Sequence, residues 1–408
     1  MSETKPLRDP TPEPGRRRRH GGWRPAAANA ALATTSIALC AGAAEVAARI
    51  ALRRAPESVS VQYTESDPVR GWRHRPGARG RFGSAEYVIN SRGLRDVERP
   101  LIAPGVQRVL VLGDSFAEGF SVRLEEAVPR VLERELEGAG CPVEVVGGGT
   151  VGYSTDQEYL FYRDEGAAYG AGVVVLLFFY NDIVYNARGA VRAGVPKPLF
   201  TFMGGTPRVK NYPLPPPSPP PPPGLWRGSA ALTWARQRLR EGAPEIYDAL
   251  GRLRFWSRPA REVPLELRVY EPDPPEPVEQ AWLQTEHLFR LLAREVREQG
   301  ARLLVAYVPS KMEVSRRDWE LTRRRYGIDP RSFDRGLVAR RLAEAGRRLD
   351  VPVLDLTDAL WKADGGRGRG PYFDHGGHWN ALGHSVAARE IATSLERSRW
   401  LQCGPAAP

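Results

Sequence analysis

Five short apolar runs alternate along the chain with segments whose apolar residues recur at helical spacing. Apolar runs of this length, rich in Val and Leu and bounded by polar residues or glycine, are typical of buried strands. They cover residues 107–112, 143–147, 173–179, 302–308 and 352–355. Helical patterns cover roughly residues 125–138, 155–165, 277–299, 334–349 and 381–396. This alternation predicts an α/β fold, a three-layer open parallel sheet with helices on both faces.

The N-terminal part of the chain has a different pattern. Residues 1–24 are polar and end in a basic cluster that begins at Arg16, whereas Pro25 to Ala44 contains no charged residue. This length is close to the ~20 residues that a helical membrane span needs. Basic residues before a span hold the N-terminus in the cytoplasm. We therefore expect a basic cytoplasmic tail over 1–24 and a membrane-spanning helix or signal anchor over 25–52.

Two other interpretations of this apolar segment are open. Ala41-Gly42-Ala43 has the small residues of a signal cleavage site, which would make the segment a secretory signal. The segment can also be an alanine-rich helix of a soluble domain. An uncleaved single-span anchor is the favoured interpretation, which predicts an inner-membrane protein whose main domain faces the periplasm or cell exterior.

Composition divides the remainder of the chain into four parts. Residues 53–104 form a polar lead-in with extended or hairpin character, and 105–396 carry the alternating pattern. A proline-rich insertion over 186–275 interrupts that domain, and 397–408 form a C-terminal tail. The run from Pro213 to Pro223 predicts polyproline II structure, which can bind an SH3-like partner but more commonly serves as a stiff spacer. A helix is expected after it, within 226–240.

Charge and cysteine content exclude some classes of protein. The net charge is +11, but the arginines are spread along the chain and no zinc-finger or aromatic-basic RNA-binding motif is present. We therefore do not expect a nucleic-acid partner. The three cysteines fit no disulfide framework or zinc site. Cys141 and Cys403 can pair in an oxidising compartment or remain unpaired, and both alternatives are open.

The main candidate for chemistry is Ser115, in the sequence Gly113-Asp114-Ser115-Phe116 directly after the first predicted strand. In open α/β sheets, ligands bind beyond the carboxyl ends of the strands. A serine at that edge, with backbone N–H groups near a helix start, suits nucleophilic attack on an acyl group.

Three of the six histidines lie close together near the C-terminus: His375, His378 and His384. His378 precedes a helix that Asn380 can cap, a suitable position for a general base facing the serine. Asp374 is the nearby acid that can fix the tautomer of this base. A metal site formed by Asp374 and the three histidines matches no common zinc spacing, so we expect neither a metal nor another cofactor. His384 is expected to pack on the helix.

The segments after the second and third strands can supply an oxyanion hole. The glycine-rich segment from Gly147 to Thr155 includes Gly152, whose backbone N–H can approach a substrate closely. The third strand ends at Asn181, whose side-chain amide is a second donor, and Asp182 can serve in capping. Such donors stabilise the negative charge that develops on the substrate oxygen.

Together these segments resemble the SGNH/GDSL hydrolase superfamily over roughly residues 105–396. The resemblance implies a flavodoxin-like SGNH hydrolase fold with Ser115 as nucleophile and oxyanion donor. It further implies Gly152 and Asn181 as oxyanion donors and His378 as the base. In the lead-in, the sequence Ile89-Asn90-Ser91-Arg92-Gly93-Leu94-Arg95 resembles the membrane-anchored bacterial branch of the superfamily.

The chain departs from the family pattern at three positions. Phe179 stands where the family has Gly, and Gly147 stands where it often has Asn. The family acid usually lies three residues before the histidine, where this chain has His375. Asp374 is one residue further from His378, so the loop must bulge or another acid must serve.

The resemblance implies a serine hydrolase of ester bonds, of the esterase/lipase or carbohydrate deacetylase type, acting through an acyl-enzyme. Its substrate would be an ester-bearing small molecule or an acylated carbohydrate. One alternative is an O-acetyltransferase that passes the acyl group to a cell-surface polysaccharide. An alternative of another class is a non-catalytic scaffold that uses the proline-rich segment to bind a partner.

Overall fold

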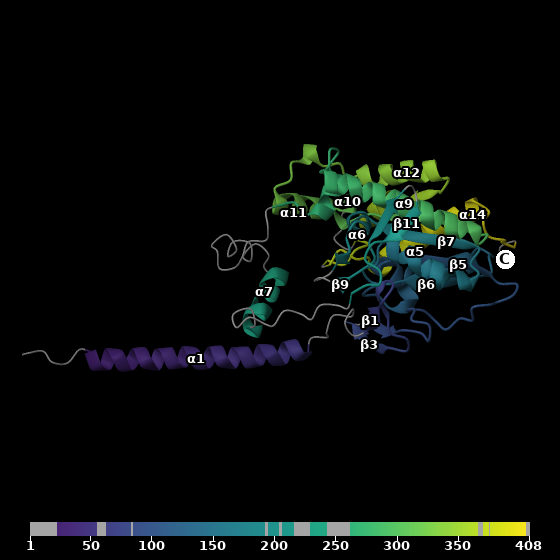
Figure 1. Ribbon diagram of the computed structural model, residues 1–408. Helices are drawn as coiled ribbons and strands as arrows, with labels where there is room; N and C mark the ends of the chain where they lie inside the picture. The colour runs from purple at the N-terminus through teal and green to yellow at the C-terminus, as the bar shows by residue number, and fades with distance from the viewer. Residues whose placement is uncertain are drawn as a thin grey trace, which may run out of the picture. The chain divides into compact units, whose positions relative to one another are not determined.

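A computed structural model describes residues 23–54, 63–82, 85–191, 195–203, 206–215, 229–242, 262–365, 370–374 and 376–404 (Figure 1). The chain forms two compact units. One combines Met1–Ala55 with Pro223–Gly242, and the other combines Pro56–Pro222 with Ala243–Pro408.

The second unit is built on a five-stranded parallel sheet. Its strands are β5 (Gln107–Gly113), β6 (Val143–Gly149), β7 (Val173–Phe179), β12 (Arg302–Val308) and β13 (Val353–Asp355). The order across the sheet is β13-β12-β7-β5-β6. Counted along the chain from its other edge this is 2-1-3-4-5, the flavodoxin-like order. All five predicted strands are therefore confirmed.

Both faces of this sheet are buried, because successive residues of each strand point to opposite sides. In β5, Leu110 and Leu112 belong to the core under α5 (Thr155–Asp164), α9 (Glu276–Glu298) and α12 (Leu337–Leu349). Val109 and Val111 belong to the core under α4 (Val128–Gly138) and α14 (Ala381–Arg397). The predicted three-layer α/β fold is confirmed.

The remaining helices of this unit are short and lie mostly in the connections. They are α3 (Ser115–Glu118), η1 (Leu124–Glu126), η2 (Gly166–Tyr169), α6 (Asn181–Asn186), η3 (Leu265–Tyr270), α10 (Lys311–Val314), α11 (Arg316–Tyr326), η4 (Pro330–Ser332) and α13 (Thr357–Asp364). Among these described helices, α3, α6, α10 and α13 begin within three residues of the carboxyl end of a sheet strand.

The lead-in consists of two antiparallel hairpins, in agreement with its predicted extended character. β1 (Thr64–Asp67) pairs with β2 (Gly71–His74), and β3 (Arg79–Phe82) pairs with β4 (Ala85–Val88). The buried Arg95 side chain then donates to the main-chain oxygens of Glu118 at 3.0 Å and Val122 at 2.7 Å. The lead-in is thereby fixed to the segment that follows Ser115.

Small hairpins that the sequence did not predict occur in the insertion. β8 (Ala190–Val191) pairs with β9 (Val195–Pro196), and β10 (Phe200–Met203) pairs with β11 (Thr206–Val209). Lys197, next to β9, forms a fully buried ion pair with Asp156 of α5. This pair joins the insertion to the helical layer. Of the predicted polyproline segment, residues 216–223 lie outside the described part of the chain.

The first unit contains α1 (Trp23–Arg54) and α7 (Ala230–Gly242), the helix expected after the proline-rich run. Within α1, the 23 residues Ala28–Ile50 are long and apolar enough to cross a bilayer, although a signal sequence shares that length and composition. The Glu45 carboxylate accepts hydrogen bonds from Ser229 Oγ at 2.8 Å and Ala230 N at 2.9 Å. It thereby caps the N-terminus of α7.

A disulfide bond joins Cys141, just before β6, to Cys403 in the C-terminal tail. The open alternative is therefore settled in favour of pairing, and Cys40 is free and exposed. The Gln107 side chain reinforces this connection, since it donates to Gln402 O at 2.8 Å and accepts from Gln402 N at 2.6 Å. The tail is thus tied to the edge of the sheet.

We predict that replacing both Cys141 and Cys403 by Ala lowers the free energy of unfolding by roughly 2–5 kcal/mol. The bond closes a loop across 262 residues, so its removal enlarges the conformational freedom of the unfolded chain. Thermal unfolding of the full chain in detergent measures this effect. Cys40→Ala is the matched control and should unfold as the unmodified protein does. Equal melting temperatures for all three proteins would contradict the prediction.

Candidate active site

Ser115 lies where β5 ends and α3 begins, and its side chain is buried. The Asp114 carboxylate caps α3 by accepting a hydrogen bond from Phe116 N at 2.9 Å. Gly113 makes the turn possible, because its φ of +148° is rare for L side chains and a Cβ there would lie 3.0 Å from Leu177 O. The sequence Gly-Asp-Ser thus turns the chain sharply enough to place the serine at the edge of the sheet.

His378 lies beside this serine although 263 residues separate them, and Ser115 Oγ is 2.9 Å from His378 Nε2. The imidazole stands between two aromatic rings, with centroids 5.3 Å from Phe116 and 4.9 Å from Phe120. The loop that carries it is closed by a hydrogen bond from Phe373 N to His378 O at 2.9 Å. A neutral imidazole at this distance can accept the hydroxyl proton of the serine.

Gly152 and Asn181 follow the two strands that flank β5. Gly152 lies in a turn after β6, and Thr150 N of that turn donates to Gly113 O at 3.1 Å. Asn181 begins α6 directly after β7, and Gly113 pairs with Leu177 of that strand. The Asn181 Oδ1 atom is buried and has no hydrogen-bond partner among the described residues. The structure therefore brings the segments of Ser115, Gly152 and Asn181 to one edge of the sheet.

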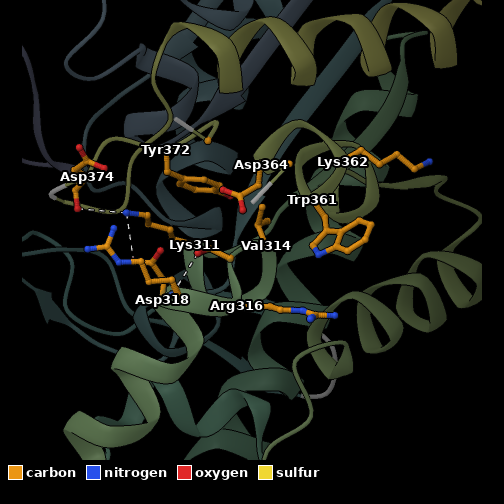
Figure 2. A pocket seen from close by; sticks show the side chains of 13 residues that line it. Lys311, Val314, Arg316, Asp318, Trp361, Lys362, Asp364, Tyr372 and Asp374 are labelled. Carbon is orange, nitrogen blue, oxygen red and sulfur yellow. Dashed lines mark hydrogen bonds and ion pairs between the residues drawn. The ribbon is translucent and has the colours of Figure 1, made fainter. Parts of the chain in front are cut away.

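Asp374 is exposed, and its backbone oxygen accepts a hydrogen bond from Lys311 Nζ at 3.3 Å. Figure 2 shows its carboxylate turned away from Lys311. Among the described contacts, no hydrogen bond joins this carboxylate to His378. His375 lies outside the described residues. The role of Asp374 as the acid that supports His378 therefore remains a prediction.

A pocket of about 620 Å³ lies beside the loop that carries His378, between that loop, α10, α11 and the end of α13 (Figure 2). Tyr372 and Asp374 of the loop line one side of it. Trp361, which is 52% exposed, and Arg316 lie at the opposite side. Lys311 connects the pocket to the loop through hydrogen bonds to Phe373 O at 3.1 Å and to Asp374 O. Aromatic, cationic and acidic side chains thus line a space beside this loop, whereas Ser115 and His378 are not among its lining residues.

Glu313 lies two residues after Lys311 in α10 and is buried in a polar network that the sequence did not predict. Its carboxylate accepts hydrogen bonds from Tyr270 OH and Ser310 N, both at 2.6 Å, and from Tyr307 OH at 2.8 Å. Burial raises the pKa of Glu313 to about 7, although these hydrogen bonds favour the charged form. The helix α10, whose Lys311 donates hydrogen bonds to the His378 loop, therefore also contains a buried carboxyl group with a pKa near neutral pH.

Two further buried carboxyl groups, Glu158 and Asp182, have no hydrogen-bond partner within the described part of the chain. Burial raises the pKa of each well above the ordinary range. The neighbouring Asp114 and Asp156 raise the pKa of both groups further, and Glu158 also raises that of Asp182. Both groups therefore hold their protons more tightly than solvent-exposed carboxyl groups do.

His384 lies within α14, as expected, and packs edge-on against Trp379 with ring centroids 5.6 Å apart. Burial lowers its pKa to about 3, and the charges of Arg95 and His378 act in the same direction. It is therefore neutral and belongs to the core. The described residues hold no cluster of three or more His, Cys, Asp or Glu side chains suited to a metal ion.

The two other departures from the family pattern have local explanations. Phe179 packs its ring 4.8 Å from Phe116, so an aromatic contact replaces the family glycine. Gly147 lies within β6, where its N–H donates to the buried Asp96 carboxylate at 2.9 Å.

The lead-in also reaches the site, which sequence patterns did not indicate. Trp72 Nε1 donates to Val151 O at 3.1 Å, and His74 Nε2 lies 3.3 Å from Glu118 Oε2. No spacing rule connects Trp72 with Val151, which lies 79 positions later, or His74 with the buried Glu118.

Comparison with known proteins identifies a similar family for the C-terminal part of the chain. Residues 271–407 match a family described as "SGNH hydrolase-like domain, acetyltransferase AlgX". Over those residues the match agrees with the resemblance seen in the sequence. It includes His378, whereas Ser115, Gly152 and Asn181 lie before it. No curated protein matches the chain.

Several solved structures are also similar to the chain. One is a lipase/acylhydrolase from Enterococcus faecalis, with 12% identity over 73% of this chain and 99% of that one, at a TM-score of 0.37. A second is a GDSL-like lipase from Bacteroides thetaiotaomicron, with 12% identity over 73% of this chain and 93% of that one, at a TM-score of 0.34. A third is an acetyl xylan esterase, with 12% identity over 71% of this chain and 99% of that one, at a TM-score of 0.37.

We predict that the buried Glu313 makes stability depend on pH. Its folded pKa of about 7 exceeds its ordinary value of 4.5, so the folded state holds this proton more tightly than the unfolded state does. This contribution to stability is complete below about pH 4.5 and is lost as the pH rises through 7, by roughly 3 kcal/mol in total. Glu313→Gln should remove that part of the pH dependence. Urea unfolding at pH 5 and pH 8 measures it, and parallel pH profiles for both proteins would contradict it.

Proposed function

We propose that the protein is a serine enzyme that cleaves ester bonds, with Ser115 as nucleophile and His378 as general base. The observation that carries this proposal is the 2.9 Å separation of Ser115 Oγ and His378 Nε2. The pair lies at the carboxyl end of β5, where the sheet order changes direction and where open α/β folds bind their ligands.

In this mechanism His378 Nε2 takes the proton of Ser115 as the hydroxyl oxygen attacks the ester carbonyl. The oxyanion of the tetrahedral intermediate accepts hydrogen bonds from Ser115 N–H, Gly152 N–H and the Asn181 amide. The intermediate collapses, the alcohol leaves with the proton from His378, and an acyl-enzyme remains. Water then attacks the acyl-enzyme with His378 again as base, which releases the acid and restores Ser115. Asp374 is the candidate group that orients His378.

Transfer of the acyl group to a carbohydrate hydroxyl is the second candidate function. The family matched by residues 271–407 is described as an acetyltransferase, which favours this alternative. The same acyl-enzyme serves both reactions, because a sugar hydroxyl can replace water in the second step. A non-catalytic scaffold is the remaining alternative, and the short Ser115–His378 distance argues against it.

We also propose that α1 anchors the protein in the inner membrane, with the basic tail in the cytoplasm and the catalytic domain outside. The Cys141–Cys403 disulfide supports this orientation, because such bonds persist mainly in oxidising compartments. The apolar stretch Ala28–Ile50 supports the anchor. A topology reporter fused after residue 60 tests it, since reporter activity in the cytoplasm would contradict the orientation.

We predict that Ser115→Ala lowers turnover of an aryl acetate by at least about 10³-fold, because the nucleophile is lost. The same substitution should abolish labelling by a fluorophosphonate probe. Ser332→Ala, at an exposed serine of η4, is the matched control and should behave as the unmodified protein. Turnover by the Ser115→Ala protein at an unchanged rate would contradict the assignment. Failure of the folded, unmodified protein to react with the probe would favour the scaffold.

We predict that the acyl acceptor can be identified in cells that lack this protein. Mass spectrometry of their surface polysaccharide should show less O-acetylation if the protein transfers acetyl groups to it. More O-acetylation would instead indicate hydrolysis. Complementation with the unmodified chain should reverse either change, whereas complementation with Ser115→Ala should not. Unchanged acetylation would exclude surface polysaccharide as the substrate of this enzyme.

A further inference from the structure

Gly152 occupies the third position of a four-residue turn, Thr150–Tyr153. The turn is closed by a hydrogen bond from Tyr153 N to Thr150 O at 3.1 Å. Gly152 has φ +75°, whereas Val151 is not among the described non-glycine residues with positive φ. These values define a type II turn, in which glycine is favoured at the third position.

The central peptide of this turn joins Val151 to Gly152. A peptide bond is planar and trans, so Val151 O and Gly152 N–H point in opposite directions. Type I and type II turns differ mainly in a half-rotation of this central peptide, and glycine at the third position tolerates both. Whatever holds the Val151 oxygen therefore decides the direction of the Gly152 N–H.

Trp72 of the lead-in holds that oxygen. Its indole Nε1 donates to Val151 O at 3.1 Å, and the side chain is buried. The contact is reciprocal, because Tyr153 OH donates to Trp72 O at 2.6 Å and the two rings pack edge to face with centroids 5.6 Å apart. Trp72 and the turn thus fix each other through two hydrogen bonds and one aromatic contact.

The preceding peptide group is also fixed, from the side of the nucleophile. Val151 N donates to Glu118 Oε2 at 2.5 Å, and Glu118 ends the short helix that Ser115 begins. His74 Nε2 lies 3.3 Å from the same oxygen, and both side chains are about 1% exposed. Burial would raise the pKa of Glu118, but His74 and the hydrogen bonds hold it below the usual value, so the carboxylate stays charged. Both peptide groups next to Val151 therefore have specific partners.

We propose that Trp72 is a positioning residue of the oxyanion hole, which selects the orientation of the Val151–Gly152 peptide in which the Gly152 N–H can bind the substrate oxyanion. This inference rests on the proposed function and adds a residue outside the four that define the superfamily. It also makes the lead-in part of the site, because the donor atom lies in β2 and its acceptor in the loop after β6.

The test uses two variants of the full chain in detergent. Trp72→Phe removes the indole N–H, and replacement of Trp72 by benzothienylalanine removes it while keeping the shape of the side chain. Both should lower kcat for an aryl acetate by about 10-fold or more with little change in KM, since a complete loss of one oxyanion donor costs about 10²–10³-fold. The matched control is Tyr63→Phe, which removes a buried lead-in hydroxyl that has no hydrogen-bond partner among the described residues.

A thionoester of the same acid separates positioning from a merely structural role. Its sulfur accepts hydrogen bonds poorly, so the ester-to-thionoester rate ratio reports the oxyanion hole. We expect this ratio to fall in both Trp72 variants and to stay unchanged in Tyr63→Phe. Unchanged kcat and an unchanged ratio in the Trp72 variants would overturn the proposal. A lower kcat with an unchanged ratio would also overturn it and assign Trp72 a structural role.

The failure of the proposed function gives a different result. If the proposed function is wrong, the unmodified protein shows neither ester turnover nor labelling of Ser115 by a fluorophosphonate. The proposed role of Trp72 is then wrong as well. Labelling of Ser115 in the unmodified protein therefore supports the proposed function before any Trp72 variant is compared.

Discussion

The position of β5 inside the parallel sheet is the constraint on which the site depends. Because β6 lies on one side of β5 and β7 on the other, the connections after these strands diverge and leave a crevice at their carboxyl ends. The residues that follow β5, β6 and β7 therefore lie at the same edge of the sheet. His378 reaches the same place from a loop that follows the last strand. A reordered sheet would keep every helix and strand but separate these groups.

The layered fold was predictable because its signals are local and repeated. A strand buried on both faces is apolar throughout, and an amphipathic helix shows its period directly. The predicted ends differ by up to three residues where local chemistry intervenes. The helix expected from 125 begins at Val128 because a 3₁₀ turn precedes it, and the helix expected from 334 begins at Leu337 after Gly336. The hairpins β8–β9 and β10–β11 were missed because strands of two to four residues have no detectable period.

The placement of Ser115, Gly152 and Asn181 was predictable, because each of them follows the carboxyl end of a predicted strand. The group that supports His378 does not follow from it. The loop before His378 contains Gly376 and Gly377, both with positive φ, so residue spacing there does not determine which acid faces the imidazole. Contacts between residues far apart in the sequence could not be predicted either. Glu313 meets two tyrosines from other elements, and no pattern within α10 indicates this.

The contact between Trp72 and Val151 changes what counts as the catalytic domain. The sequence pattern divides the chain near residue 105, yet a fragment beginning there would leave Val151 O without its indole donor and Glu118 without His74. The smallest unit that retains every described contact of the turn Thr150–Tyr153 includes the hairpin β1–β2. The hairpin β1–β2 therefore belongs structurally with the sheet, and experiments that exchange the lead-in as a simple linker would remove hydrogen-bond partners of this turn.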